Sequence, residues 1–250
     1  MTDAHLIRQV GRLAGAPRLL VGSDFDGTLS VLCDRPDHAV IEPRARQALE
    51  SLAELPRTSV AVISGRTRAE LVGLVGCHAG IQLIGAHGAE RAGVPIGISD
   101  TALSVRGIQD TVAAIVAGRQ GFLLERKPTG VTLHYRLVRD RNTVDQVMQS
   151  VLAGPAAAPG VRTIAGKEVL ELTIALATKG STVRELRRGV THTLFLGDDI
   201  TDEDAFAVLG PDDVGVKVGD GETRASHRVA GVSEVAELLE TLARLRTTHR

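Results

Sequence analysis

The segment RLLVGSDFDGT occupies residues 18–28 and places two carboxylates directly after an apolar run. Residues 18–22 are typical of a buried strand that ends in a polar loop. Asp24 and Asp26 can therefore project into one pocket at the strand end. One carboxylate can attack phosphorus, while the other protonates the departing oxygen and later takes a proton from water. Gly27 permits a tight turn, and Thr28 can direct its hydroxyl or amide at phosphate oxygens.

Further short apolar segments repeat this pattern at residues 59–63, 81–85, 193–197 and 214–218. Helical spacing marks residues 43–55, and candidate capping boxes begin at Thr67, Thr182 and Thr201. Strands that alternate with helices predict an α/β fold built on a doubly wound parallel sheet. Ligands of such sheets bind beyond the carboxyl ends of the strands. Asp24, Ser64 and Asp198 would all lie there.

The middle of the chain, residues 102–178, has a different pattern. We expect helices at 105–117 and 143–152, antiparallel strands at 121–126 and 129–137, and further strands through Leu172. This α+β pattern predicts a cap domain inserted into a core formed by residues 1–101 and 179–250. The Ala/Pro/Gly-rich loop at 153–160 is also compatible with a simple connection.

Composition narrows the choice of partner and compartment. The chain has 250 residues, 43% hydrophobic and 24% charged, which is typical of a soluble globular protein. A net charge of −1 gives no electrostatic attraction to nucleic acid or membrane, so we expect a small-molecule partner. We also expect a monomer. The first 15 residues lack the apolar run of a signal peptide, and no stretch approaches the roughly 20 apolar residues of a membrane span. We therefore expect a cytoplasmic protein.

Carboxylates packed around a phosphoryl group repel it, so the predicted site requires a cation. Mg²⁺ prefers oxygen ligands and commonly bridges carboxylates and phosphate. We predict Asp24, Asp26 and Asp198 as its ligands, with Asp199 and Asp202 as alternative or supporting carboxylates. Part of the acidic run at residues 198–204 also forms a helix N-terminus.

Two other segments place phosphate-binding groups beside helix N-termini. Ser64, Gly65 and Arg66 precede one capping box, and Lys179 precedes another. Amides at a helix N-terminus strengthen an anion site. We expect Ser64 to bond a phosphate oxygen and Lys179 to neutralise both the phosphate and the Asp24 nucleophile.

Taken in order, residues 24–28, Ser64, Lys179 and residues 197–199 resemble the four motifs of the haloacid dehalogenase (HAD) superfamily. The resemblance implies a HAD-like Rossmannoid core and an aspartyl-phosphate intermediate on Asp24. Transporting ATPases of that superfamily have Thr where this chain has Asp26, so the resemblance implies a phosphatase. A cap between the Ser64 and Lys179 motifs resembles the larger cap class, whose members mostly act on phosphosugars.

The chain also resembles the trehalose-6-phosphate phosphatase family, in stretches at residues 26–30, 62–66, 85–88, 125–127, 133–136, 166–171 and 197–206. This resemblance implies hydrolysis of trehalose 6-phosphate to trehalose and phosphate. It also implies that the sugar is held by Lys127, His134, Arg136, Lys167 and Glu171 of the cap and by Gly85, His87 and Gly88 of the core.

One departure from that family leaves the substrate open. After Glu171-Leu172 the family usually continues with Arg-Pro, whereas this chain continues Thr-Ile-Ala-Leu-Ala-Thr before Lys179. A sucrose-, glucosylglycerol- or pseudo-disaccharide-type phosphate is therefore an alternative substrate. A non-catalytic phosphosugar sensor is a further alternative, although a sensor would have no need of both Asp24 and Lys179.

Overall fold

The computed structural model describes residues 4–33 and 35–248. The first three residues, residue 34 and the last two residues of the predicted core therefore lie outside the described residues. The chain divides into two compact units, one formed by residues 1–94 and 177–250 and the other by residues 95–176. No helix within the described ranges is long and apolar enough to cross a membrane.

The first unit contains a six-stranded sheet in the order β10-β9-β8-β1-β2-β3, with every neighbouring pair parallel. Its strands are β1 (Leu19–Ser23), β2 (Thr58–Ile63), β3 (Ile81–Ile84), β8 (His192–Gly197), β9 (Val214–Val218) and β10 (His227–Val229). All five residues of β1 and of β9 are buried, as expected for strands covered on both faces. The predicted doubly wound parallel sheet is confirmed.

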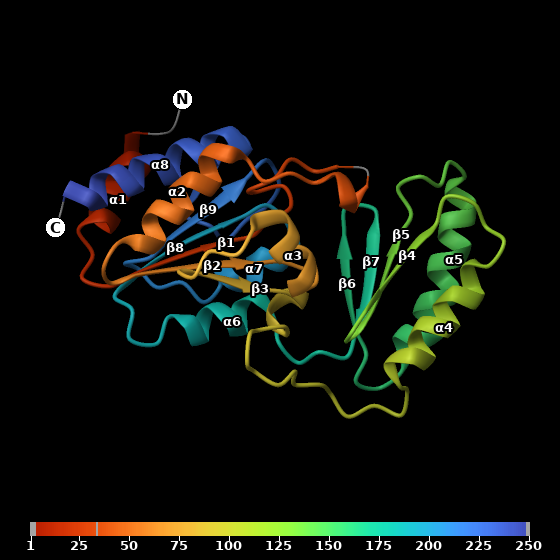
Figure 1. Ribbon diagram of the computed structural model, residues 1–250. Coiled ribbons are helices and arrows are strands. Elements are labelled where there is room, and N and C mark those ends of the chain that lie inside the picture. The colour runs from red at the N-terminus through yellow and green to blue at the C-terminus, as the bar shows by residue number, and fades with distance from the viewer. Residues whose placement is uncertain (1–3, 34, 249–250) are drawn as a thin grey trace. The chain divides into compact units, whose positions relative to one another are not determined.

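Helices cover both faces of this sheet, as Figure 1 shows. One apolar core joins the sheet to α1 (Ala4–Ala14), α2 (Pro43–Glu54), α3 (Arg68–Val75) and α8 (Val232–Thr248). A second core joins it to α6 (Lys179–Leu186) and α7 (Ile200–Phe206), through buried residues such as Phe195 and Phe206. The 3-10 turns of this unit are η1 (Pro36–His38) and η2 (Ala86–Gly88).

Strand register brings the predicted motifs to one edge of the sheet. Ser23, the last residue of β1, pairs with Val62 of β2 and with Leu196 of β8. Asp24, Ser64 and Asp198 follow these strands within one or two residues. Their side chains therefore begin from neighbouring strand ends, as the sequence predicted.

Of the three predicted capping boxes, one is correct and two are wrong. The Thr67–Glu70 capping box opens α3 as expected. The box expected at Thr182 is wrong, because Thr178 caps α6 and Thr182 lies inside that helix. The box expected at Thr201 is also wrong, because the carboxylate of Asp199 caps α7. In both cases a side chain further upstream already accepts from the first free amides of the helix.

The second unit has a four-stranded antiparallel sheet in the order β4-β5-β7-β6. Its elements are α4 (Val105–Val116), β4 (Leu123–Lys127), β5 (Gly130–His134), α5 (Arg141–Ala153), η3 (Pro155–Ala157), β6 (Arg162–Gly166) and β7 (Val169–Thr173). Apolar residues of α4 and α5 pack on one face of this sheet and form its core (Figure 1). The predicted α+β pattern is present, and the opposite face of the sheet is left for polar side chains.

The division between the units lies at residues 95 and 176, whereas the predicted boundaries were 102 and 178. Ile98 forms a bridge with Ala175, and the amide of Ser99 donates to the carbonyl of Ile174 at 2.8 Å. These bonds group residues 95–101 with the second unit. Thr178 groups with the first unit because it caps α6.

Candidate active site

Three carboxylates meet at the carboxyl ends of β1 and β8. One oxygen from each of Asp24, Asp198 and Asp202 lies within 4.8 Å of the others, and all three residues are buried. Gly27 makes this approach possible. Its φ is +78°, and a Cβ atom at this position would lie 2.2 Å from Oδ2 of Asp198. Any other residue in the turn would therefore collide with Asp198.

Lys179, the first residue of α6, binds two of these carboxylates. Its Nζ atom lies 2.8 Å from Oδ1 of Asp24 and 2.8 Å from Oδ1 of Asp202. Burial opposes the charge of Lys179, but attraction to Asp202 and Asp24 outweighs burial and raises the pKa of this lysine. Burial also raises the pKa of Asp24 well above its usual value. Attraction to Lys179 acts against that rise, and repulsion from Asp202 and Asp198 adds to it.

Asp202 holds the loop that carries Asp198. Its Oδ2 accepts from the amides of Asp198 at 3.1 Å and Asp199 at 3.0 Å, while Oδ1 accepts from Lys179. The side chain of Asp199 accepts from the amide of Ile200 at 2.8 Å. Both Asp202 oxygens are thus occupied by the ammonium and two amides, and Asp199 lies outside the three-carboxylate group found among the described residues. Asp24 and Asp198 are therefore the better candidates for metal ligation, with Asp24 also bonded to Lys179.

Asp26 is engaged elsewhere. Its two oxygens accept from Arg66, with Nε to Oδ2 at 2.8 Å and Nη2 to Oδ1 at 2.7 Å. Its carboxylate does not belong to the three-carboxylate group found among residues 4–33 and 35–248. Asp26 and Arg66, predicted as metal ligand and substrate ligand, therefore contact each other.

Two hydroxyls lie near these strand ends. Ser64 is buried, and its Oγ accepts from the amide of Arg66 at 3.2 Å. Thr28 is also buried, and its Oγ1 has no hydrogen-bond partner within the described ranges. Buried hydroxyls normally have a partner, so Thr28 is well suited to bond a bound oxyanion.

The predicted segment from Gly85 to Gly88 packs against the loop that contains Ser64 and Arg66. The amide of Ala86 donates to the carbonyl of Arg66 at 2.7 Å, and that of His87 donates to the carbonyl of Ser64 at 2.9 Å. A Cβ atom on Gly65 would lie 2.7 Å from the His87 ring. These contacts give Gly65 and His87 a structural role in supporting the loop. Gly85 and Gly88 are also closely packed, because a Cβ atom would collide with the backbone of Arg68 at Gly85 and with the Thr182 side chain at Gly88.

A second cluster lies on the face of the antiparallel sheet opposite α4. Nζ of Lys127 lies 2.6 Å from Oε2 of Glu171, which also accepts from Thr132 at 3.1 Å. Nε2 of His134 lies 3.1 Å from Oε2 of Glu125. Burial opposes the charge of Glu125, but the bond to His134 and attraction to Lys127 lower its pKa. The cluster combines several donors and acceptors in a partly buried setting.

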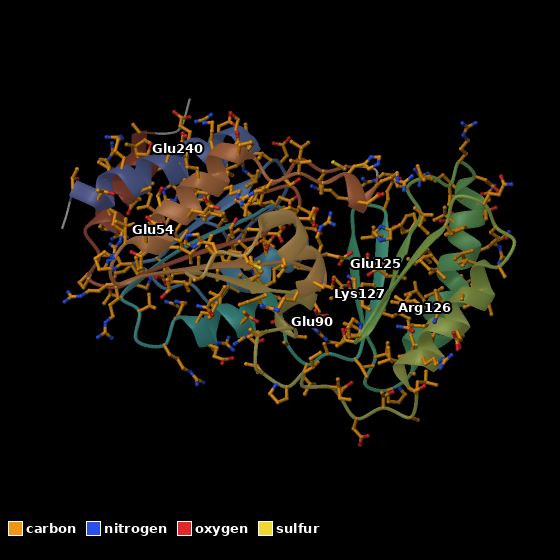
Figure 2. The ribbon with its side chains drawn as sticks, viewed as in Figure 1. Glu54, Glu90, Glu125, Arg126, Lys127 and Glu240 are labelled. Atoms are coloured by element: carbon orange, nitrogen blue, oxygen red, sulfur yellow. The ribbon has the colours of Figure 1, made fainter. Side chains whose placement is uncertain are left out.

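Alternation along β4 explains this arrangement. Glu125 and Lys127 project to one face, whereas Arg126 projects toward α4 and lies 2.9 Å from Asp110 (Figure 2). The two remaining predicted cap residues lie near the β6–β7 turn, where Nη2 of Arg136 donates to the carbonyl of Lys167 at 3.1 Å.

Sequence reasoning missed two residues of these clusters. Glu125 was not predicted as a site residue, although its position two residues before Lys127 in a strand puts both on one face. Lys217 was also missed. It is buried in β9 and donates to the backbone carbonyl of Asp198. The rarity of lysine in this chain was the available signal, because only four of the 29 lysines and arginines are lysines.

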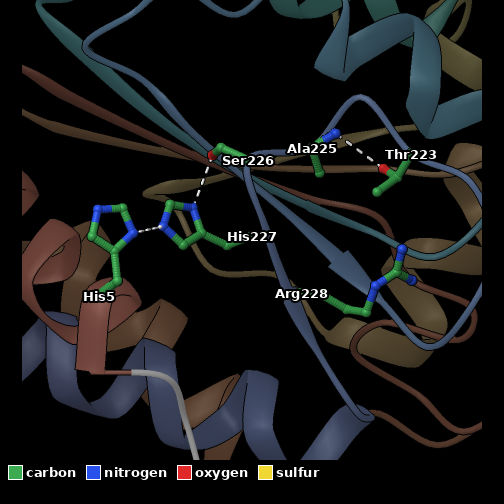
Figure 3. Close-up of a pocket in the computed structure, with 6 residues that line it drawn as sticks. All are labelled: His5, Thr223, Ala225, Ser226, His227 and Arg228. Atoms are coloured by element: carbon green, nitrogen blue, oxygen red, sulfur yellow. Dashed lines mark hydrogen bonds between the residues drawn. The ribbon is translucent and has the colours of Figure 1, made fainter.

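A separate pocket of the first unit lies beside β10. It is lined by His5, Thr223, Ala225, Ser226, His227 and Arg228 (Figure 3). The rings of His5 and His227 stack with centroids 5.0 Å apart and share a hydrogen bond of 3.0 Å. This contact links α1 to β10, and no predicted site residue is among those lining the pocket.

Comparison with known proteins decides the family. A family model described as trehalose-phosphatase matches residues 23–237. The chain belongs to the trehalose-phosphatase family. The resemblance found in the sequence is thereby confirmed.

Relatives within the trehalose-phosphatase family cover most of this chain. It is 35% identical over 259 residues to a trehalose-phosphate phosphatase of Mycobacterium ulcerans, covering 95% of this chain and 65% of that protein. It is 32% identical over 229 residues to trehalose-6-phosphate phosphatase of Escherichia coli K12, covering 88% of this chain and 84% of that protein. The chain thus spans slightly less than two thirds of the mycobacterial relative.

Solved structures confirm the fold. The C-terminal domain of C. albicans trehalose-6-phosphate phosphatase superposes with a TM-score of 0.82 at 23% identity, covering 98% of each chain. A trehalose-6-phosphate phosphatase related protein superposes with a TM-score of 0.73 at 26% identity, covering 92% of this chain and all of that one. A HAD subclass IIB sugar phosphatase superposes with a TM-score of 0.55 at 16% identity, covering 88% of this chain and 96% of that one.

Proposed function

We propose that this protein hydrolyses trehalose 6-phosphate to trehalose and inorganic phosphate through an aspartyl-phosphate on Asp24. The observation that carries the proposal is the convergence of Asp24, Asp198 and Lys179 at one edge of the sheet in a member of the trehalose-phosphatase family. Membership supports the substrate, since the E. coli relative is named for that phosphatase activity.

In the first proposed step, a carboxylate oxygen of Asp24 attacks phosphorus, and the bond from phosphorus to the sugar oxygen breaks. Asp26 donates a proton to that departing oxygen. In the second step, water attacks phosphorus, Asp26 takes a proton from the water, and phosphate leaves Asp24. Lys179 keeps Asp24 in place and offsets its charge while the anionic phosphoryl group approaches.

Several buried carboxylates gathered around the Lys179 ammonium suit a hard divalent cation with oxygen ligands. Mg²⁺ would be held mainly by Asp24 and Asp198, with Asp202 and Asp199 as further candidates, whereas the Asp26 carboxylate is engaged by Arg66. When bound, such an ion offsets the negative charge of the phosphoryl group. Thr28 and Ser64 would bond the phosphoryl oxygens. Gly65 would let the loop that carries Ser64 pack closely against the His87 ring.

We propose that the sugar is recognised by the polar cluster of the second unit. Lys127, Glu171, Glu125 and His134 present charged donors and acceptors that match the hydroxyl groups of a glucose ring. Arg136 and Lys167 would extend this surface. The cytoplasmic location and monomeric state expected from the sequence remain predictions.

A phosphosugar panel tests the proposal. The full chain would be assayed with Mg²⁺ on trehalose 6-phosphate, a sucrose phosphate, glucosylglycerol phosphate and an aminocyclitol phosphate, and compared by kcat/KM. We expect trehalose 6-phosphate to be preferred. A preference of about tenfold or more for another member of the panel would overturn the substrate assignment. The panel is needed because the sequence after Leu172 departs from the usual family sequence.

A further inference from the structure

The contact between Arg66 and Asp26 has the geometry of a dedicated pair. Two different nitrogens of one guanidinium bond the two oxygens of one carboxylate, at 2.8 Å and 2.7 Å. A bidentate pair of this kind fixes the plane of the carboxylate as well as its distance. Asp26 needs such a restraint, because its side chain retains 32% exposure at the edge of a turn.

Arg66 is itself held in place. Its side chain is 11% exposed, and Cζ lies 5.6 Å from the centroid of the buried Phe25 ring. The amide of Arg66 donates to Ser64 Oγ, and its carbonyl accepts from Ala86. A guanidinium that stacks on an aromatic ring from a fixed backbone loses little further freedom when it bonds a carboxylate.

The two carboxylates of residues 24–26 therefore have different cations. Lys179 bonds Asp24, and Arg66 bonds Asp26. This separation matches the two tasks of the proposed function. A nucleophile must approach phosphorus, whereas a general acid must point at the leaving oxygen, and the efficiency of proton transfer depends on that orientation.

We infer that Arg66 is a positioning residue for Asp26, and that its guanidinium is not a main ligand of the phosphoryl group. This inference rests on the proposed function. In the step it serves, the O–H bond of the Asp26 carboxyl breaks as the proton moves to the leaving oxygen, which keeps the electron pair of its broken bond to phosphorus. Arg66 neither gives nor takes a proton. The sequence favoured Arg66 as a phosphate ligand, and the two roles predict different kinetics.

Arg66→Met and Arg66→Lys would be compared with the unaltered chain on trehalose 6-phosphate and on p-nitrophenyl phosphate. The value of kcat/KM reports the steps through release of the alcohol, and p-nitrophenolate leaves with little need of a proton. We expect Arg66→Met to lower kcat/KM for the phosphosugar by about 100-fold. The loss in kcat/KM for the aryl ester should be about tenfold or less. Arg66→Lys should recover part of the loss. Calorimetry with inorganic phosphate should give a Kd within about threefold of the unaltered chain.

Arg91→Met is the matched control. Arg91 is another arginine of this unit with 15% side-chain exposure, paired with Glu185 at 3.0 Å, and it should behave like the unaltered chain on both substrates. Equal losses on both substrates, together with phosphate binding weakened by about tenfold or more, would overturn the inference and make Arg66 a phosphate ligand.

A measurement without turnover separates this inference from the proposed function. Unfolding by urea would be followed for Arg66→Met, Asp26→Ala and the double variant. A pair that orients Asp26 should give a coupling of at least about threefold in the unfolding equilibrium constant. Additive effects of the two substitutions would contradict the pairing. If the unaltered chain hydrolyses neither ester, the proposed function fails, whereas the cycle still tests the pair.

Discussion

The Nζ atom of Lys179 lies 2.8 Å from Oδ1 of Asp24, and both side chains are buried. This one ammonium also serves Asp202, so it offsets only part of the carboxylate charge around it. The pKa of Asp24 consequently stays raised by burial, despite its contact with a cation. The site is built for function at a cost to the stability of the folded chain.

The first prediction concerns stability and pH. A raised folded-state pKa means that the folded chain holds the Asp24 proton more tightly than the unfolded chain does. The contribution of Asp24 to stability is therefore lost as pH rises from its unfolded value of about 3.9 through its raised folded value. In EDTA, Asp24→Asn should be more stable than the unaltered chain at pH 8, and the difference should shrink toward pH 4. Thermal unfolding across this range measures it.

Asp212→Asn is the control for that series, because Asp212 has an exposed side chain with only a 3.5 Å contact to Arg12. It should show no such trend with pH. If Asp24→Asn destabilises the metal-free chain at pH 8, attraction to Lys179 outweighs burial and the account of Asp24 is wrong.

The second prediction concerns the sugar. Replacing Lys127 by Met removes the ammonium that bonds Glu171 and lies 3.7 Å from Glu125. We expect kcat/KM for trehalose 6-phosphate to fall by about 100-fold, because charged hydrogen bonds to the sugar are lost. Hydrolysis of p-nitrophenyl phosphate, which has no sugar, should change by less than about threefold.

Arg126→Met, on the same strand but directed toward Asp110, is the matched control. Because loss of one partner leaves a buried carboxylate uncompensated, Glu125→Gln provides a milder variant that keeps the Lys127–Glu171 pair. Comparable losses on both substrates in Lys127→Met and Glu125→Gln would remove this cluster from sugar recognition.

The third prediction concerns the core. Arg246 on α8 is buried, and its guanidinium donates to the carbonyls of Ala14 at 3.1 Å, Ala16 at 2.9 Å and Arg57 at 3.1 Å. It thereby ties α8 to the end of α1 and to the segment before β2. Arg246→Met leaves these carbonyls without their donor and should lower the free energy of unfolding by about 3 kcal/mol.

Arg244, an exposed residue of the same helix, is the natural comparison. Arg244→Met should change the free energy of unfolding by less than about 0.5 kcal/mol. Equal effects of the two substitutions in urea titrations would mean that Arg246 acts only through helix propensity.

The sequence predicted the sheet and the meeting of its motifs because both follow from simple rules. Apolar runs closed by polar residues mark buried parallel strands, and their carboxyl ends share one edge of the sheet. The proximity of Asp24, Asp198 and Lys179 follows from those two rules and from the position of Lys179 at a helix start.

Partner choice within the site could not be predicted in the same way. Whether Arg66 binds phosphate or Asp26 depends on the direction of one side chain, which no sequence pattern encodes. Helix starts at Thr178 and Asp199 were missed because two nearby residues could each serve as the cap. Glu125 was overlooked, although strand alternation alone places it beside Lys127.

The central claim is that phosphate is transferred to Asp24, and rapid acid quenching with ³²P-labelled trehalose 6-phosphate and Mg²⁺ tests it most directly. We predict that the chain becomes labelled during turnover, that tandem mass spectrometry places the phosphate on Asp24, and that Asp24→Asn neither acquires label nor releases phosphate. Phosphate release from a chain that never carries label, or full turnover by Asp24→Asn, would contradict the account.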